Sequence, residues 1–101
     1  MRKEVIPSNQ LSLVKFKTEW SGTCQILKPI YNDLVNSYKG IVGFFTIDVE
    51  VEKGIEAEYG IMELPTILFF RDGKIIDHAA GLTSRNILIT KIKNAISASD
   101  N

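Results

Sequence analysis

Apolar residues recur along this chain in patterns that predict β-strands. Residues 11–17 are rich in β-branched and aromatic side chains, which is typical of a strand, and Val14 and Phe16 fall on one face of it. The opposite face, which we expect to be wetter, carries Leu13, Lys15 and Lys17. Residues 41–48 form a continuous apolar run, as expected of a central strand that is covered on both faces.

Turn-forming residues divide the second half of the chain into a short helix and a hairpin. Residues 51–59 predict a short helix that is closed by Gly60. Segments 66–70 and 74–80 then flank Arg71-Asp72-Gly73, a short glycine-containing turn. Such a turn between two apolar segments predicts a pair of antiparallel strands.

Helical spacing of apolar residues predicts two longer helices. The first should be capped by Ser21, end near Gly40 and kink at Pro29, because proline lacks the amide hydrogen that a helix needs. Its apolar positions are Ile26, Leu27, Ile30, Leu34 and Val35. The last helix should be capped by Thr83 or Ser84. Its apolar stripe consists of Leu88, Ile92, Ala95 and Ile96.

The expected order is β-α-β-α-β-β-α, which indicates an α/β fold with a mixed four-stranded sheet between helices. The first two strands should be parallel, because a helix connects them through a right-handed crossover. We expect residues 1–101 to form a single domain, in which residues 97–101 are a polar tail that frays.

Composition and charge exclude several classes of function. The chain has 101 residues, of which 45% are hydrophobic and 24% are charged, as in ordinary soluble domains. Lys and Arg together number 12, as do Asp and Glu, so no net charge attracts nucleic acid or an anionic membrane. No apolar stretch is long enough to cross a bilayer, and residues 1–10 lack the apolar centre of a signal peptide. A single cysteine excludes an internal disulfide and fits a reducing compartment, so we expect a cytoplasmic protein.

The most informative segment is Trp20-Ser21-Gly22-Thr23-Cys24, which precedes the first apolar helix. It is followed by Lys28-Pro29, Tyr59-Gly60-Ile61, Leu64-Pro65-Thr66, Asp72-Gly73 and Gly81. In this order and spacing the chain resembles the thioredoxin family from about residue 11 to about residue 96. The resemblance implies the thioredoxin fold and a role in thiol–disulfide exchange with protein substrates.

Members of that family usually carry an additional strand and helix at the front. Only ten residues precede Leu11 here, which cannot hold both elements. We therefore expect a shortened amino end, with at most a short edge strand at residues 3–6. The wetter face of the first full strand would follow from this missing cover.

Dithiol exchange needs two cysteines at a spacing of three. One thiolate attacks the substrate disulfide and the second resolves the mixed disulfide that forms. By resemblance, Cys24 matches the resolving cysteine, whereas Ser21 occupies the attacking position. A serine hydroxyl is not appreciably ionised at neutral pH, so a dithiol cycle within one chain is impossible. Whether the protein is an enzyme therefore stays open.

Two histories could explain Ser21: a serine variant of an active Cys-Gly-Thr-Cys protein, or a natural protein that has lost the dithiol cycle. Many thioredoxins place a buried carboxylate six residues before the attacking cysteine, where this chain has Lys15. They often place a lysine in the following strand, at the position that matches Phe44. The acid–base assistance of the family is thus absent, which favours the natural history.

Leu64-Pro65-Thr66 resembles the cis-proline loop of the family, which lies against the active-site loop and pairs with an extended substrate. The resemblance implies an apolar groove formed by Trp20, Met62, Leu64, Pro65 and Gly81, next to Gly22 and Thr23. Simpler explanations exist for each residue. The groove residues can be packing residues without a partner, Ser21 a helix cap, and Cys24 a small buried hydrophobic side chain.

Three functions remain open. The first is a redox protein in which only Cys24 reacts, recycled by a small thiol or by a partner resembling thioredoxin reductase. The second is a non-catalytic module that binds proteins or peptides in the groove. The third is a peroxidase-like thiol, suggested by the Ser21-x-x-Cys24 spacing, although Trp20 and Leu64-Pro65-Thr66 favour thioredoxin. His78 is the only histidine, so no metal site is expected, and nothing indicates a cofactor.

Overall fold

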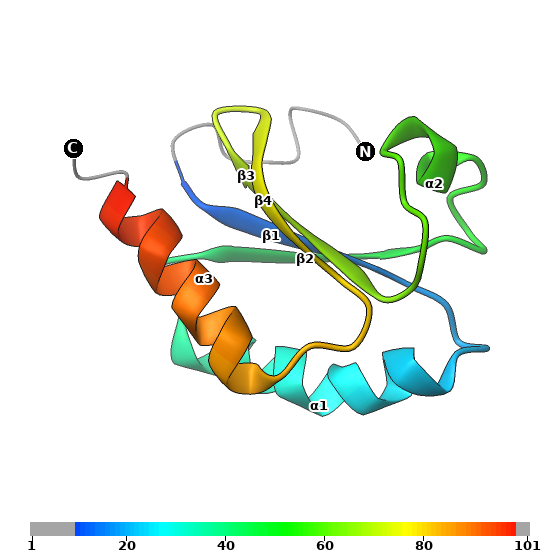
Figure 1. Cartoon of the computed structure of the whole chain (residues 1–101), viewed down its shortest axis with the longest axis horizontal. Coiled ribbons are helices and arrows are strands. Elements are labelled where there is room, and N and C mark those ends of the chain that lie inside the picture. Colours follow the sequence, from blue (N-terminus) through cyan, green and yellow to red (C-terminus); the bar gives the residue numbers. More distant parts are fainter. Residues whose placement is uncertain (1–9, 99–101) are drawn as a thin grey trace.

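A computed structural model describes residues 10–98, which form a mixed four-stranded sheet with helices on both faces (Figure 1). The elements are β1 (Ser12–Lys17), α1 (Gly22–Ser37), β2 (Gly43–Asp48), α2 (Ile55–Glu58), β3 (Thr66–Arg71), β4 (Lys74–Ala80) and α3 (Arg85–Ala98). This order confirms the predicted β-α-β-α-β-β-α arrangement and the α/β class. The predicted short strand at residues 3–6 lies outside the described residues, whereas α3 includes residues 97 and 98, which we had assigned to the tail.

The strand order in the sheet is β2-β1-β3-β4. Strands β1 and β2 are parallel, as predicted, and both the β1–β3 and β3–β4 pairs are antiparallel. The prediction that residues 41–48 form a central strand is not confirmed among the described strands, where β2 lies at the edge of the sheet. Its apolar side chains are only partly buried, and they pack against both core clusters from that edge.

Strand β1 is buried on both faces, so the prediction of a wetter face was wrong. Leu13 is fully buried, and only 5% of Lys15 is exposed. Helix α1 covers this face, and the ring of Tyr31 from α1 lies 4.6 Å from the Lys15 ammonium nitrogen. The aliphatic stem of a lysine can line an apolar interior, which is why the alternation of residue types misjudged Lys15.

Two apolar clusters hold the layers together, one on each face of the sheet. The first joins the sheet to α1 and α3, and includes Leu13, Leu27, Leu34, Phe69, Leu88 and Ile92. The second joins it to α2, and includes Val14, Phe16, Ile55, Leu68 and Phe70. Each cluster takes alternate residues of β1 and β3, as the period of a strand requires.

The helix and turn signals of the sequence are visible in hydrogen bonds and dihedral angles. The Ser84 hydroxyl accepts a bond from the Ile87 amide at 3.2 Å, so Ser84 rather than Thr83 caps α3. Helix α2 is shorter than the predicted 51–59 segment. Asp72 and Gly73 both have positive φ angles, of 55° and 75°, which is the type I′ geometry of a two-residue hairpin.

Candidate functional site

The loop before α1 is held by Ser21. Ser21 has an extended backbone and its hydroxyl accepts a bond from the Cys24 amide at 3.3 Å, which is the geometry of a helix cap. The Ser21 and Thr23 hydroxyl oxygens lie 2.8 Å apart. Ser21 therefore stabilises the first turn of α1, in which one of the otherwise unpaired amides finds a partner.

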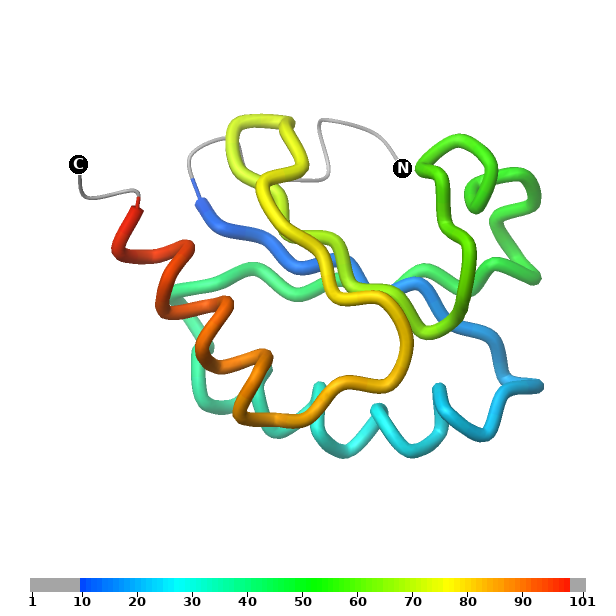
Figure 2. Tube along the Cα trace, in the orientation of Figure 1, coloured from blue at the N-terminus to red at the C-terminus, as the bar shows by residue number. Residues whose placement is uncertain are grey.

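The loop contacts the turn before β3, although the two are far apart in sequence. The Thr23 hydroxyl donates a hydrogen bond to the Leu64 carbonyl oxygen at 3.2 Å. The peptide bond between Leu64 and Pro65 is cis, and the Pro65 carbonyl accepts a bond from the Gly81 amide at 2.7 Å. These two segments and the end of β4 lie at the same end of the sheet in Figure 2. We call these four residues, Thr23, Leu64, Pro65 and Gly81, the loop–proline junction.

Replacing Gly81 by any other residue would strain the backbone at this junction. Its φ angle is +77°, a conformation that side chains with a Cβ rarely adopt. A Cβ atom at this position would lie 3.0 Å from a carboxylate oxygen of Glu63. A glycine therefore allows β4 to reach the Pro65 carbonyl.

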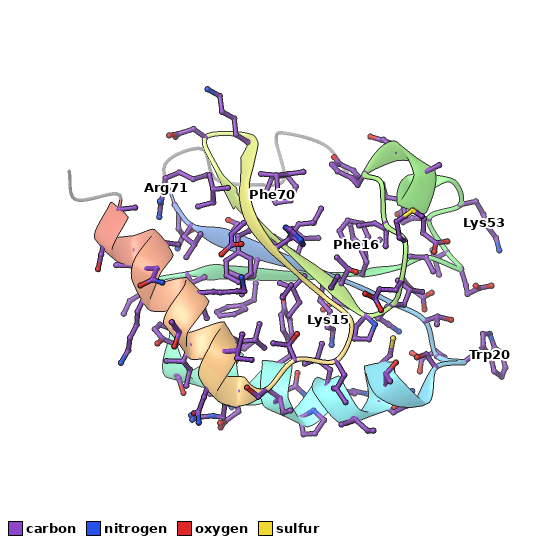
Figure 3. All side chains as sticks on the ribbon, viewed as in Figure 1. Lys15, Phe16, Trp20, Lys53, Phe70 and Arg71 are labelled. Carbon is purple, nitrogen blue, oxygen red and sulfur yellow. The ribbon has the colours of Figure 1, made fainter. Side chains whose placement is uncertain are left out.

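The two large apolar side chains expected in the groove are almost fully exposed. Trp20 is 86% exposed and Met62 is 93% exposed, whereas Pro65 is buried. Figure 3 shows the Trp20 side chain pointing away from the protein. A cavity of about 360 Å³ shares only Met62 with the predicted groove, and its other lining residues belong to the α2 side of the sheet. The structure thus brings the junction residues together and leaves Trp20 and Met62 as exposed apolar groups.

Cys24, the only cysteine, points inward from the first turn of α1 and is 5% exposed. It borders a cavity of about 130 Å³ between β1, β2 and α1. The residues that line this cavity are Lys15, Lys17, Thr18, Glu19, Cys24, Gln25, Lys28, Asn32 and Thr46. We call it the Lys15 cavity. Three lysines and one thiol therefore share a single small space.

Two of the lysines differ sharply in their surroundings. Burial, together with the charge of Lys17, lowers the pKa of Lys15 below its usual value of 10.5. Hydrogen bonds to Glu19 and Asp48 raise the pKa of Lys17, which forms ion pairs with both carboxylates. Two carboxylates therefore compensate the charge of Lys17. The Lys15 ammonium instead lies over the face of an aromatic ring.

Sequence reasoning singled out Lys15 as a departure from the family but missed the cavity. A signal was present, because Cys24, Lys28 and Asn32 follow one another at intervals of four and must share one face of a helix. Which strand residue they would face depends on the packing of α1, which the local pattern does not specify.

The rest of the described chain offers no comparable centre. Within residues 10–98, no group of three His, Cys, Asp or Glu residues could hold a metal ion. His78 lies on β4 and lines the larger cavity, away from Cys24. No helix in the same range is long and apolar enough to span a membrane.

Comparison with known proteins agrees with this geometry. The family model described as Thioredoxin matches residues 1–94. A thioredoxin of Rickettsia felis is 36% identical over 95 residues, which cover 94% of this chain and 90% of that protein. Thioredoxins of Chlorobaculum thiosulfatiphilum, 31% identical over 92% of this chain and 86% of the relative, and of Mycoplasmoides gallisepticum, 33% identical over 89% of both, are similar as well. The chain therefore belongs to the thioredoxin family.

Proposed function

We propose that this protein binds extended segments of other proteins at the loop–proline junction and does not run a dithiol cycle. The contact between Thr23 and Leu64 carries the proposal, because it fixes the loop and the turn against each other without a sulfur atom. Trp20 and Met62 lie exposed on the flanking segments and provide apolar area for a partner. Aromatic and methionine side chains are enriched where proteins bind one another.

The backbone at Leu64 suits strand-like pairing with a peptide. Its carbonyl oxygen has two lone pairs, of which the Thr23 hydroxyl uses one, so a peptide amide can use the other. Main-chain bonds of this kind provide affinity with little demand on sequence, and neighbouring side chains provide selectivity. Protein recognition in this form does not depend on a second cysteine.

The redox chemistry of the family is limited by the side chains in the loop. Thiol–disulfide exchange needs an accessible thiolate. Ser21, at the start of α1, has a hydroxyl group instead. Cys24 holds the only thiol, and only 5% of that residue is exposed to a bulky protein disulfide. We therefore propose that catalysis of protein disulfide reduction is absent or slow in the chain as it stands.

A binding experiment tests the recognition part of the proposal. A peptide enriched from a library of random linear peptides by selection on this protein serves as the probe. Trp20→Ala should weaken its binding about tenfold, which is typical of an exposed aromatic anchor, whereas Cys24→Ser should change it by less than about twofold. Ile41→Ala is the matched control, because Ile41 is also an exposed apolar residue but follows the other end of α1. Equal losses in the Trp20 and Ile41 variants would contradict the proposal.

A disulfide-reduction assay tests the catalytic part. With insulin and dithiothreitol, the chain as it stands should reduce disulfides no faster than its Cys24→Ser variant. Ser21→Cys should accelerate the reaction by at least about tenfold, because it supplies the attacking thiol at the start of α1. Clear acceleration by the unaltered chain, lost in Cys24→Ser, would refute the absence of catalysis and favour a single-thiol mechanism.

A further inference from the structure

The starting observation is a lysine that is almost entirely buried and whose ammonium group forms no ion pair with the described carboxylates. Lys15 is 5% exposed, and in residues 10–98 its ammonium forms no ion pair or hydrogen bond. Its contact is the face of the Tyr31 ring, at 4.6 Å from the ring centroid. Figure 3 shows the Lys15 side chain between the sheet and α1, on the side where the Lys15 cavity lies.

The charges around the Lys15 cavity do not balance. Glu19 is the only carboxylate that lines it, and Glu19 is paired with Lys17, which also binds Asp48. Lys15 and Lys28 remain without a carboxylate partner among the described residues, Lys15 at the inner wall and Lys28 at the exposed rim. Two ammonium groups that form no ion pair with the described residues therefore line one small space.

Burying a charge is costly unless an opposite charge or a set of hydrogen bonds compensates it. The lowered pKa of Lys15 is in line with this cost, since burial is its main cause. The other polar lining groups include the Thr46 hydroxyl and the Asn32 amide, which can both donate hydrogen bonds. In liquid water, each molecule occupies about 30 Å³. A cavity of about 130 Å³ therefore has room for a tetrahedral oxyanion.

We propose that the Lys15 cavity is a binding site for a small inorganic oxyanion of the size of phosphate or sulfate. The Lys15 ammonium supplies a positive charge at the inner wall, and Lys28 supplies a second one at the entrance. Because Cys24 borders the same space, a bound anion shields its thiol from reagents that enter through the cavity. The site is separate from the loop–proline junction, so it does not depend on the function proposed above.

The test is a titration of the isotope-labelled protein with sodium phosphate and, separately, with sodium sulfate, at constant ionic strength. Backbone amide shifts should saturate and should cluster at the residues that line the cavity. Lys15→Met keeps the length and apolar stem of the side chain but removes its charge, and should weaken binding about tenfold, as for a buried charge-assisted contact. Lys53→Met is the matched control, because Lys53 is exposed and lies near α2 (Figure 3), and it should bind like the unaltered protein.

A second readout follows the thiol. The rate at which iodoacetamide alkylates Cys24 should fall as phosphate or sulfate saturates the cavity, with the same concentration dependence as the amide shifts. If Lys15→Met does not fold, Lys28→Met replaces it and should weaken binding about threefold, as expected of one exposed charge.

Two results would overturn the proposal. One is a titration in which the backbone amide shifts grow linearly with anion concentration, or in which they are equal in all variants. The other is an alkylation rate that falls in Lys15→Met but is independent of added anions in the unaltered protein, because the ionised thiol itself would then be the counter-charge of Lys15. A saturable response to one anion alone would support the proposal and identify that anion.

Discussion

At the scale of single residues, one hydroxyl group on Ser21 has two separate effects. It stabilises the start of α1 by accepting a bond from the Cys24 amide. In the function that we propose, it also stands where disulfide exchange would need an attacking thiol. The structural and the proposed chemical effect of this position can be measured independently, because stability depends on the hydroxyl as an acceptor and disulfide exchange depends on a thiol.

Ser21→Ala should lower the free energy of unfolding by about 1 kcal/mol, because the Cys24 amide loses its cap. Urea denaturation at neutral pH measures the change. Ser97→Ala is the control, since Ser97 is exposed within α3 and should tolerate alanine without loss. Equal stability of the Ser21 variant and the unaltered protein would show that the bond contributes nothing.

Lys15 makes a prediction that depends on pH. Its pKa in the folded protein is lowered from 10.5, so the folded state holds the proton less tightly than the unfolded state does. Between the lowered pKa and 10.5, the unfolded state binds more protons, and the stability contributed by this group rises with pH. Lys15→Met should therefore stabilise the protein at neutral pH, by about 1 kcal/mol in a buffer without oxyanions.

The gain from Lys15→Met should shrink as pH rises through the lowered pKa of Lys15 towards 10.5. Urea denaturation of both proteins across this pH range measures the difference between their free energies of unfolding. Other groups titrate alike in both proteins, so their contributions cancel in this difference. Lys53→Met, at an exposed position, should show no such trend. A gain that is constant with pH would mean that the ammonium charge is not the cause.

At the scale of elements, Tyr31 connects α1 to the two parallel strands. Its hydroxyl lies 3.1 Å from the Leu13 carbonyl oxygen of β1 and 2.8 Å from that of Phe45 in β2. The same ring contacts Phe44 edge-on and carries the Lys15 ammonium on its face. One helix residue thus fixes the position of α1 over the strands that form the wall of the Lys15 cavity.

Tyr31→Phe should lower the free energy of unfolding by about 1 kcal/mol, because it removes the hydrogen bonding of a buried hydroxyl to the strand carbonyls. Tyr38→Phe, near the end of α1, is the control and should have little effect. Burial raises the pKa of Tyr31, so the contribution of its hydroxyl is complete below pH 10.0 and is lost as pH rises further. Urea denaturation should therefore show that the difference in the free energy of unfolding between the variant and the unaltered protein becomes smaller above that pH.

Local patterns predicted most of these elements but not their neighbours in space. The hairpin at Asp72-Gly73 and the cap at Ser21 follow from residue types a few positions apart, and both were confirmed. The position of β2 outside the other described strands and the burial of Lys15 depend on which elements pack together. No window of sequence contains that information, and the cavity beside Cys24 was missed for the same reason.

At the scale of the whole molecule, stability depends on the two apolar clusters on either side of the sheet. Leu88 of α3 is fully buried in the cluster shared with α1, whereas its neighbour Ile87 is 51% exposed. Arg85 of α3 also binds Asp33 of α1 at 2.7 Å, but both side chains are exposed and such pairs contribute little. The attachment of α3 should therefore depend on apolar burial.

Leu88→Ala should lower the free energy of unfolding by about 2 to 5 kcal/mol, because it removes buried methyl groups and leaves a cavity. Ile87→Ala, one residue away, should cost less than about 1 kcal/mol. Thermal or urea denaturation compares the two variants directly. Similar losses in both would contradict the assignment of the α3 face that packs on the sheet.

The exposed position of Trp20 also makes the molecule its own optical reporter. The chain contains one tryptophan, so its indole fluorescence comes from a single place, directly before the capped loop. An indole in water emits at longer wavelength than one covered by apolar groups. Any protein segment that settles on Trp20 should shift the emission to the blue, and occupancy could then be followed in real time without a dye.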